Sequence, residues 1–230
     1  MPFYYMDYWY VIFVIPPMLL AIWASFNVNS TFKKYSKVTN RYGLTGAEAA
    51  RKILDKNGLY NVRVERVAGN LTDHFDPKSN VIRLSESVHD SNSVAAVGVA
   101  AHEAGHAVQY AEDYTPMKIR GSLVGVANIG SSAGIYLAIF GIILTMPLLS
   151  YIGIGLFCAV VAFQLVTLPV EFNASSRALV ALEQGYLSEE EMKGTRKVLR
   201  AAALTYVAAL LSAIGNLLRL IMLVNGRNRD

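Results

Sequence analysis

The sequence predicts a mainly α-helical membrane protein, with about four transmembrane helices and a small α+β unit on the cytoplasmic side. The first observation is composition: the chain is 53% hydrophobic and 17% charged, whereas soluble domains average about 25% charged residues. The second is distribution, because the apolar residues form long uncharged runs, of which 121–170 covers fifty positions. The third is the more polar segment before this run, in which stretches with the apolar spacing of a helix are followed by stretches with that of a strand.

Four apolar runs are long enough to cross a bilayer, whose hydrocarbon core needs about 20 residues of helix. The expected spans are about 8–28, 124–146, 152–170 and 202–224. A turn near 147–151 is expected between the second and the third. The first span is interpreted as an uncleaved anchor rather than a signal peptide, because residues 1–8 contain no Lys or Arg and no clean cleavage site follows. Pro16 and Pro17 should kink its helix.

The distribution of lysine and arginine predicts the orientation. Basic residues follow the first span, precede the second and lie between the third and fourth, whereas the N-terminus and the 147–151 turn have none. The positive-inside rule therefore places 29–123 and 171–201 in the cytoplasm. Arg227 and Arg229 would then lie outside, which the rule disfavours, so the topology of the last helix stays open.

The predicted organisation follows from the spans and their orientation. Its segments are an N-terminal transmembrane anchor at 1–28, a cytoplasmic segment at 29–123, two transmembrane helices at 124–170, a second cytoplasmic segment at 171–201, and a C-terminal transmembrane helix and tail at 202–230. The net charge of +4 is explained by the basic flanks of the spans. A nucleic-acid-binding role is not expected, because it needs a clustered basic face.

The first cytoplasmic segment is expected to fold into a small α+β unit. Thr45 and Glu48 form a capping box that should begin a helix. The expected elements are this helix to about residue 56, a strand at 61–67, a loop at 73–77, a short strand at 81–84 and a helix at 94–111. Strand 81–84 is a candidate edge strand for pairing with an extended peptide. An ordinary hairpin that covers a small core is an equal alternative.

His102 and His106 lie one turn apart on the last of these helices. Each can give a ring nitrogen to one shared metal ion, at about 2.0–2.1 Å. Glu103 should project beside the metal, where a carboxylate can take a proton from a metal-activated water. This is the H-E-x-x-H arrangement of zinc peptidases. The plainer alternative is a chance pentapeptide with two structural histidines.

Glu171 is the candidate third ligand, which a catalytic zinc site needs beside two histidines and an open fourth position. It is the first charge after the fifty-residue apolar run. The predicted orientation puts it on the same membrane side as the two histidines. The alternatives are a plain interface carboxylate or an ion-pair partner of Arg177.

Three further residues are weaker candidates for a supporting role. Ser175 lies one helical turn after Glu171 and could hydrogen-bond a metal ligand. Arg177 could stabilise developing negative charge, although a salt bridge or an interface anchor is the plainer interpretation. His74 could donate to an oxyanion, although loop histidines are more often solvated or structural.

The pairing of His102-Glu103-Ala104-Gly105-His106 with Glu171-Phe172-Asn173-Ala174-Ser175 resembles the HtpX-like and CAAX-prenyl-type membrane zinc peptidases. Those proteins combine H-E-x-x-H with E-x-x-A-D, so Ser175 stands where they have Asp. Over nearly its full length, the chain resembles more closely the YugP-type neutral zinc metallopeptidases of bacterial membranes. The resemblance implies that His102, His106 and Glu171 bind zinc and that Glu103 is the general base.

These inferences together predict a multi-pass zinc metalloendopeptidase with a zincin-like catalytic unit. It is expected to hold one Zn²⁺ and to lie in the bacterial inner (cytoplasmic) membrane, with its active site on the cytoplasmic side. Its expected partners are a protein or peptide substrate and the lipid bilayer. The sequence indicates neither the physiological substrate nor the oligomeric state.

Two rival functions belong to other classes. A non-proteolytic zinc-binding scaffold or regulator would keep the histidines, but a purely structural zinc site has no need of Glu103. A metal transporter would need ionisable residues within its spans, and Arg219 is the one charged residue in the expected spans.

Overall fold

The computed structural model describes residues 7–227, which form two compact units. The helical unit contains 7–25, 119–168 and 205–227, and the mixed unit contains 26–118 and 169–204. The predictions that concern Arg229 and the two ends of the chain lie outside the described residues.

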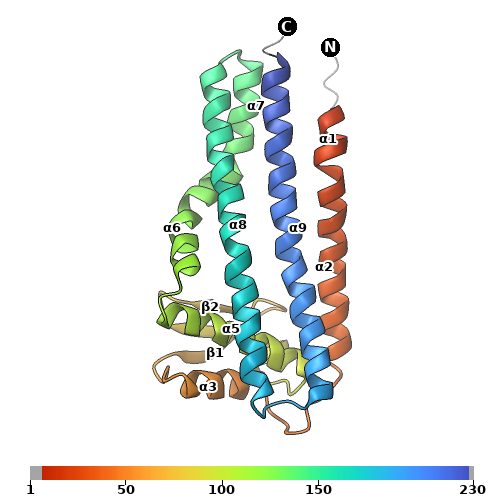
Figure 1. The fold of residues 1–230 in the computed structure, drawn as a ribbon, viewed down its shortest axis with the longest axis vertical. Helices are drawn as coiled ribbons and strands as arrows, with labels where there is room; N and C mark the ends of the chain where they lie inside the picture. Colours follow the sequence, from red (N-terminus) through yellow and green to blue (C-terminus); the bar gives the residue numbers. More distant parts are fainter. Residues whose placement is uncertain (1–6, 228–230) are drawn as a thin grey trace. The chain divides into compact units, whose positions relative to one another are not determined.

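Four helices among the described residues are long and apolar enough to cross a membrane, as the sequence predicts (Figure 1). They are Tyr8–Tyr35, Thr115–Ile143, Pro147–Glu183 and Glu189–Gly226. The last two are much longer than the expected spans. Their polar ends belong to the mixed unit, because nothing in the sequence stops the helix where the apolar run stops.

The first of these helices is interrupted where the sequence places its two prolines. Helix α1 (Tyr8–Phe13) ends, Val14 forms a turn, and α2 (Ile15–Tyr35) follows. Pro16 and Pro17 have no N–H with which to continue the helical ladder, so the carbonyl groups one turn earlier lose their usual partners. The expected kink is thus a short break in the helix.

The helical hairpin of the second and third long helices turns earlier than expected. Helix α6 (Thr115–Ile129) continues through a π-helical turn, η1 (Gly130–Gly134), into α7 (Ile135–Ile143). The expected turn at 147–151 is wrong. The chain turns at 144–146, where Thr145 has a φ of 55°, and Pro147 already begins α8 (Pro147–Glu183). Proline is favoured in the first helical position, where its missing N–H costs nothing.

The mixed unit begins with α3 (Gly46–Lys56), which has the predicted end and the predicted Thr45–Glu48 capping box. Its sheet has three strands rather than the two expected: β1 (Arg63–Val67), β2 (His74–Asp76) and β3 (Val81–Ser85), in the order β1-β3-β2. Strand β3 pairs in parallel with β1 and antiparallel with β2. After β3 come α4 (Glu86–His89) and α5 (Val94–Ala111), and α9 (Glu189–Arg227) ends the chain.

Two expectations about this sheet are wrong. The expected loop at 73–77 contains strand β2, because Asp76 accepts hydrogen bonds from the backbone N–H groups of Lys78 and Ser79 and so shapes the turn that returns the chain to β3. Segment 81–84 is not an edge strand. It is the central strand, and its residues are buried in the pattern of a strand covered on both faces.

Helix α5 is the centre of the mixed unit and has the predicted bounds. Ser93 caps it by accepting a hydrogen bond from the N–H of Ala96. Almost every side chain from Val94 to Gln109 is buried, among α3, β3 and the polar ends of α8 and α9. Alanine and glycine dominate this helix, and their small side chains allow its neighbours to approach from several directions.

Candidate metal centre

His102 and His106 lie on the same face of α5, as their spacing predicts. Their rings are nearly perpendicular, with centroids 4.7 Å apart. His106 is buried and His102 is partly buried. The Nε2 atoms of both rings face the same carboxylate on α8.

That carboxylate belongs to Glu171, whose side chain is almost completely buried, with the residue 1% exposed. Its Oε2 lies 3.2 Å from Nε2 of His102 and 3.5 Å from Nε2 of His106. One ligand atom from each of the three residues lies within 4.8 Å of the other two, so the group can hold a metal ion. Two imidazoles and one carboxylate are the donor set of a catalytic zinc site, in which the fourth position stays open.

The two helices approach closely where the group forms. A Cβ atom at Gly105 would lie 2.7 Å from the backbone oxygen of Ala174, closer than real Cβ atoms come. Gly105 precedes His106, and Ala174 lies three residues after Glu171. The absence of a side chain at Gly105 therefore brings the carboxylate within reach of the histidines.

The second nitrogen of each ring also has a partner. The hydroxyl of Ser175 lies 3.1 Å from Nδ1 of His102, which places this residue where the sequence suggested a supporting role. Nδ1 of His106 lies 3.0 Å from Oε1 of Gln109, a residue that sequence reasoning missed. The sequence offers one partial signal, a polar residue three positions after His106 on the predicted helix, but the partners of Gln109 on α8 cannot be predicted from it.

Glu103 lies beside the group rather than in it. The residue is 8% exposed, and its Oε2 accepts a hydrogen bond of 2.9 Å from the backbone N–H of Phe75 in β2. The ring of Phe75 packs against Tyr110, with centroids 5.8 Å apart. Strand β2, which the sequence did not predict, therefore fixes the carboxylate of Glu103.

Charge within the site favours the cationic form of one histidine. Burial by itself lowers the pKa of His106, but the hydrogen bond to Glu171 and the charge of Glu103 outweigh it and raise that pKa above its ordinary value. A cation bound here would thus displace a proton.

Burial also raises the pKa of the Asp73 carboxyl, helped by the nearby charge of Glu103 and opposed by hydrogen bonds from Ser85.

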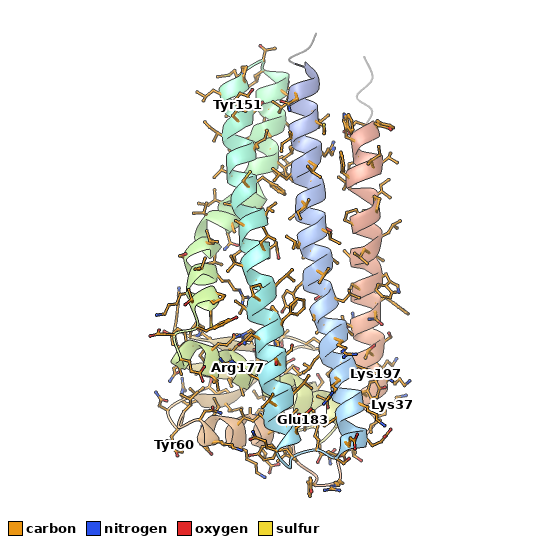
Figure 2. The ribbon with its side chains drawn as sticks, viewed as in Figure 1. Lys37, Tyr60, Tyr151, Arg177, Glu183 and Lys197 are labelled. Atoms are coloured by element: carbon orange, nitrogen blue, oxygen red, sulfur yellow. The ribbon has the colours of Figure 1, made fainter. Side chains whose placement is uncertain are left out.

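The other two candidates face different partners. Nε of Arg177 donates to Oδ1 of Asn173 at 2.7 Å, and its Nη2 pairs with Glu112 at 2.7 Å. Figure 2 shows Arg177 on α8, on the side of α5. His74 is exposed, and its Nδ1 lies 2.8 Å from the carbonyl oxygen of Thr72. An oxyanion role for either residue stays a prediction.

A cavity of about 340 Å³ lies elsewhere in the mixed unit, between α3, α5 and α8. Its walls include Ile53, Gly105 and Arg177, but none of the two histidines, Glu171 or Glu103. The candidate metal centre is therefore a cluster of side chains between α5 and α8, and this cavity is not part of it.

Comparisons with known proteins identify the family of this chain. Residues 10–225 match the model of a family described as "putative neutral zinc metallopeptidase". The chain is 48% identical over 223 residues to "Putative membrane protease YugP" of Bacillus subtilis (strain 168), covering 96% of this chain and 99% of that protein. No solved structure matches the chain.

These matches extend through all four helices of membrane-spanning length as well as through the candidate metal centre. A relative named as a membrane protease and four such helices agree that this is a membrane protein. Since both matches cover nearly the whole chain, the protein belongs to the family of putative neutral zinc metallopeptidases.

Proposed function

We propose that the protein is a zinc-dependent endopeptidase of the bacterial cytoplasmic membrane, in which His102, His106 and Glu171 hold one zinc ion. The observation that carries this proposal is the convergence of two Nε2 atoms on one buried carboxylate, at 3.2 and 3.5 Å. Burying an ionised carboxylate is costly unless it is paired or bound to a metal. The family supplies the choice of zinc.

A zinc ion held by these three residues would act as a Lewis acid, which can polarise a carbonyl group and lower the pKa of water to about 7. In this mechanism Glu103 takes the proton of the attacking water and passes it to the leaving amine. The Phe75 N–H holds the Glu103 carboxylate in place for both transfers. His102 and His106 would bind the ion as neutral imidazoles, and the Glu171 carboxylate would offset part of its charge.

The substrate is proposed to be a protein or peptide, and the centre is proposed to face the cytoplasm. The basic residues that flank the long helices support this orientation. A zincin-like catalytic unit, formed by the H-E-x-x-H helix and the adjoining sheet, is the interpretation that we favour for the mixed unit. A zinc-binding scaffold without proteolytic activity is the alternative.

Replacing Glu103 with Gln separates the two functions. The amide cannot accept the proton, so cleavage should fall by about 10²–10⁴-fold, while zinc content stays at the wild-type level because the three ligands are intact. Newly formed protein N-termini should be compared in cells that express the wild type, Glu103→Gln or the matched control Glu86→Gln, an exposed residue of α4. Identical sets of termini for the wild type and Glu103→Gln would refute the proteolytic role.

A further inference from the structure

Gln109 uses both ends of its amide in the interior of the mixed unit. The residue is completely buried, on α5 one turn after His106. Its Oε1 lies 3.0 Å from Nδ1 of His106. Its Nε2 lies 2.8 Å from the backbone oxygen of Val170 and 2.9 Å from Oδ1 of Asn173. The amide thus connects a histidine of the candidate centre to the helix that carries Glu171.

The chemistry of these partners fixes which way the amide points. A backbone carbonyl oxygen can only accept, so the atom facing Val170 must be the donor Nε2. The atom facing Asn173 must also donate, because Oδ1 of Asn173 already accepts from Nε of Arg177, and a guanidinium nitrogen can only donate. The other amide atom, the acceptor Oε1, must therefore face His106.

The orientation of the amide in turn fixes the proton on the ring. An amide oxygen can only accept, so Nδ1 of His106 must carry a hydrogen. In the neutral ring the lone pair then lies on Nε2, the atom that faces Glu171. When a metal-ligating histidine donates the N–H of its other ring nitrogen to an acceptor, that hydrogen bond fixes the tautomer.

His102 has no such constraint from its own neighbour. Its Nδ1 faces the hydroxyl of Ser175, which can either donate or accept. Ser175 therefore tolerates either tautomer, whereas Gln109 permits only one. The tautomer of His106 is therefore fixed by Gln109, whereas the tautomer of His102 is not fixed by Ser175.

We propose that Gln109 is a positioning residue, which keeps the proton of His106 on Nδ1 and leaves Nε2 for the metal. Arg177 and Asn173 support it by fixing the orientation of its amide, and the ion pair of Arg177 with Glu112 anchors that support. This inference rests on the proposed function, because it assigns a role toward the zinc that His106 would bind.

The test compares full-length wild-type protein with Gln109→Met, which keeps the size of the side chain but removes the acceptor Oε1 together with the donor Nε2. Gln184→Met, at an exposed position directly after the end of α8, is the matched control. Zinc affinity, measured by competition with a chelator, should fall by about 10–100-fold in Gln109→Met and stay unchanged in Gln184→Met. Equal affinity in Gln109→Met and wild type would overturn the role of Gln109.

Imidazole nitrogen spectroscopy of the zinc-loaded protein, with ¹⁵N-labelled histidine, gives a second readout that general destabilisation would not move. In the wild type, the His106 signals should show a hydrogen-bonded proton on Nδ1 and zinc on Nε2. In Gln109→Met that proton should lose its hydrogen-bonded shift and exchange faster with water. Zinc on Nδ1 of His106 in the wild type would overturn the inference even if Gln109→Met failed to fold.

The two proposals fail in different ways. A wild-type protein that binds no zinc contradicts the proposed function. A wild-type protein that binds zinc through Nε2 of His106, together with a Gln109→Met protein of equal affinity and unchanged Nδ1 signal, contradicts only the role of Gln109.

Discussion

Both units bring helices into backbone contact at a glycine, but the contacts serve different ends. In the helical unit, a Cβ at Gly215 of α9 would lie 1.9 Å from the carbonyl oxygen of Phe13. That carbonyl lies four residues before Pro17, which cannot donate to it. In the mixed unit, a Cβ at Gly105 would lie 2.7 Å from the carbonyl oxygen of Ala174. The first contact joins two helices where one is broken, and the second also assembles a cluster of ligands.

The contact at Gly215 supports only helix packing, whereas the contact at Gly105 supports both helix packing and the candidate metal centre. Close packing in the helical unit can change without touching any candidate ligand. The same change in the mixed unit moves Glu171 away from His102 and His106. A substitution at the glycine contact of the mixed unit should therefore lower both stability and zinc content. A substitution at the glycine contact of the helical unit should lower stability alone.

The largest effect is expected from Gly105→Val. The added side chain forces α5 and α8 apart, so most of the zinc should be lost and the free energy of unfolding should fall by about 3 kcal/mol. Zinc content and the thermal midpoint in detergent measure the two effects. Gly155→Val is the control, because a Cβ there meets open space. A Gly105→Val protein with full zinc would break the link between this contact and the centre.

Gly215→Val should destabilise the protein by a similar amount, about 1–3 kcal/mol, but leave its zinc in place. The helical unit would lose the contact at the break between α1 and α2, and the three candidate ligands lie in the mixed unit. The same two measurements apply. Loss of zinc in folded Gly215→Val protein would show that the two units are not independent in this respect.

The smallest effect is expected from Ser175→Ala. Its hydroxyl is partly exposed and tolerates either tautomer of His102, so water can replace it. Zinc affinity should fall by about tenfold at most, at the low end of the range for groups that support a ligand. Zinc affinities of Ser175→Ala and Gln109→Met, both measured by chelator competition, check the order of the two effects. A larger loss for Ser175→Ala than for Gln109→Met would reverse the ranking of the two supports.

The predictable parts of the molecule are those that depend on neighbours in sequence. The bounds of α5 followed from a run without proline that is rich in Ala and Val, and the spacing of His102 and His106 put them on one face. Glu171 was found because a charge that ends a long apolar run is conspicuous. The four long helices followed from hydropathy alone.

The parts that were missed depend on neighbours in space. Strand β2 is three residues long and exists because Asp76 shapes its turn and β3 offers a partner, neither of which a periodic pattern reveals. The central position of β3 required knowledge of both its neighbours. Gln109 acquires its role only once α8 lies beside α5, since two of its three partners belong to that helix.

The most direct test of the candidate centre is the zinc content of purified Glu171→Ala protein, measured beside the wild type. Glu183→Ala, an exposed carboxylate farther along α8, is the matched control (Figure 2). We predict one zinc ion per chain in the wild type and in Glu183→Ala, and almost none in Glu171→Ala. A folded Glu171→Ala protein that retains its zinc would contradict the account, because the ion would then be held without the carboxylate on which both histidines converge.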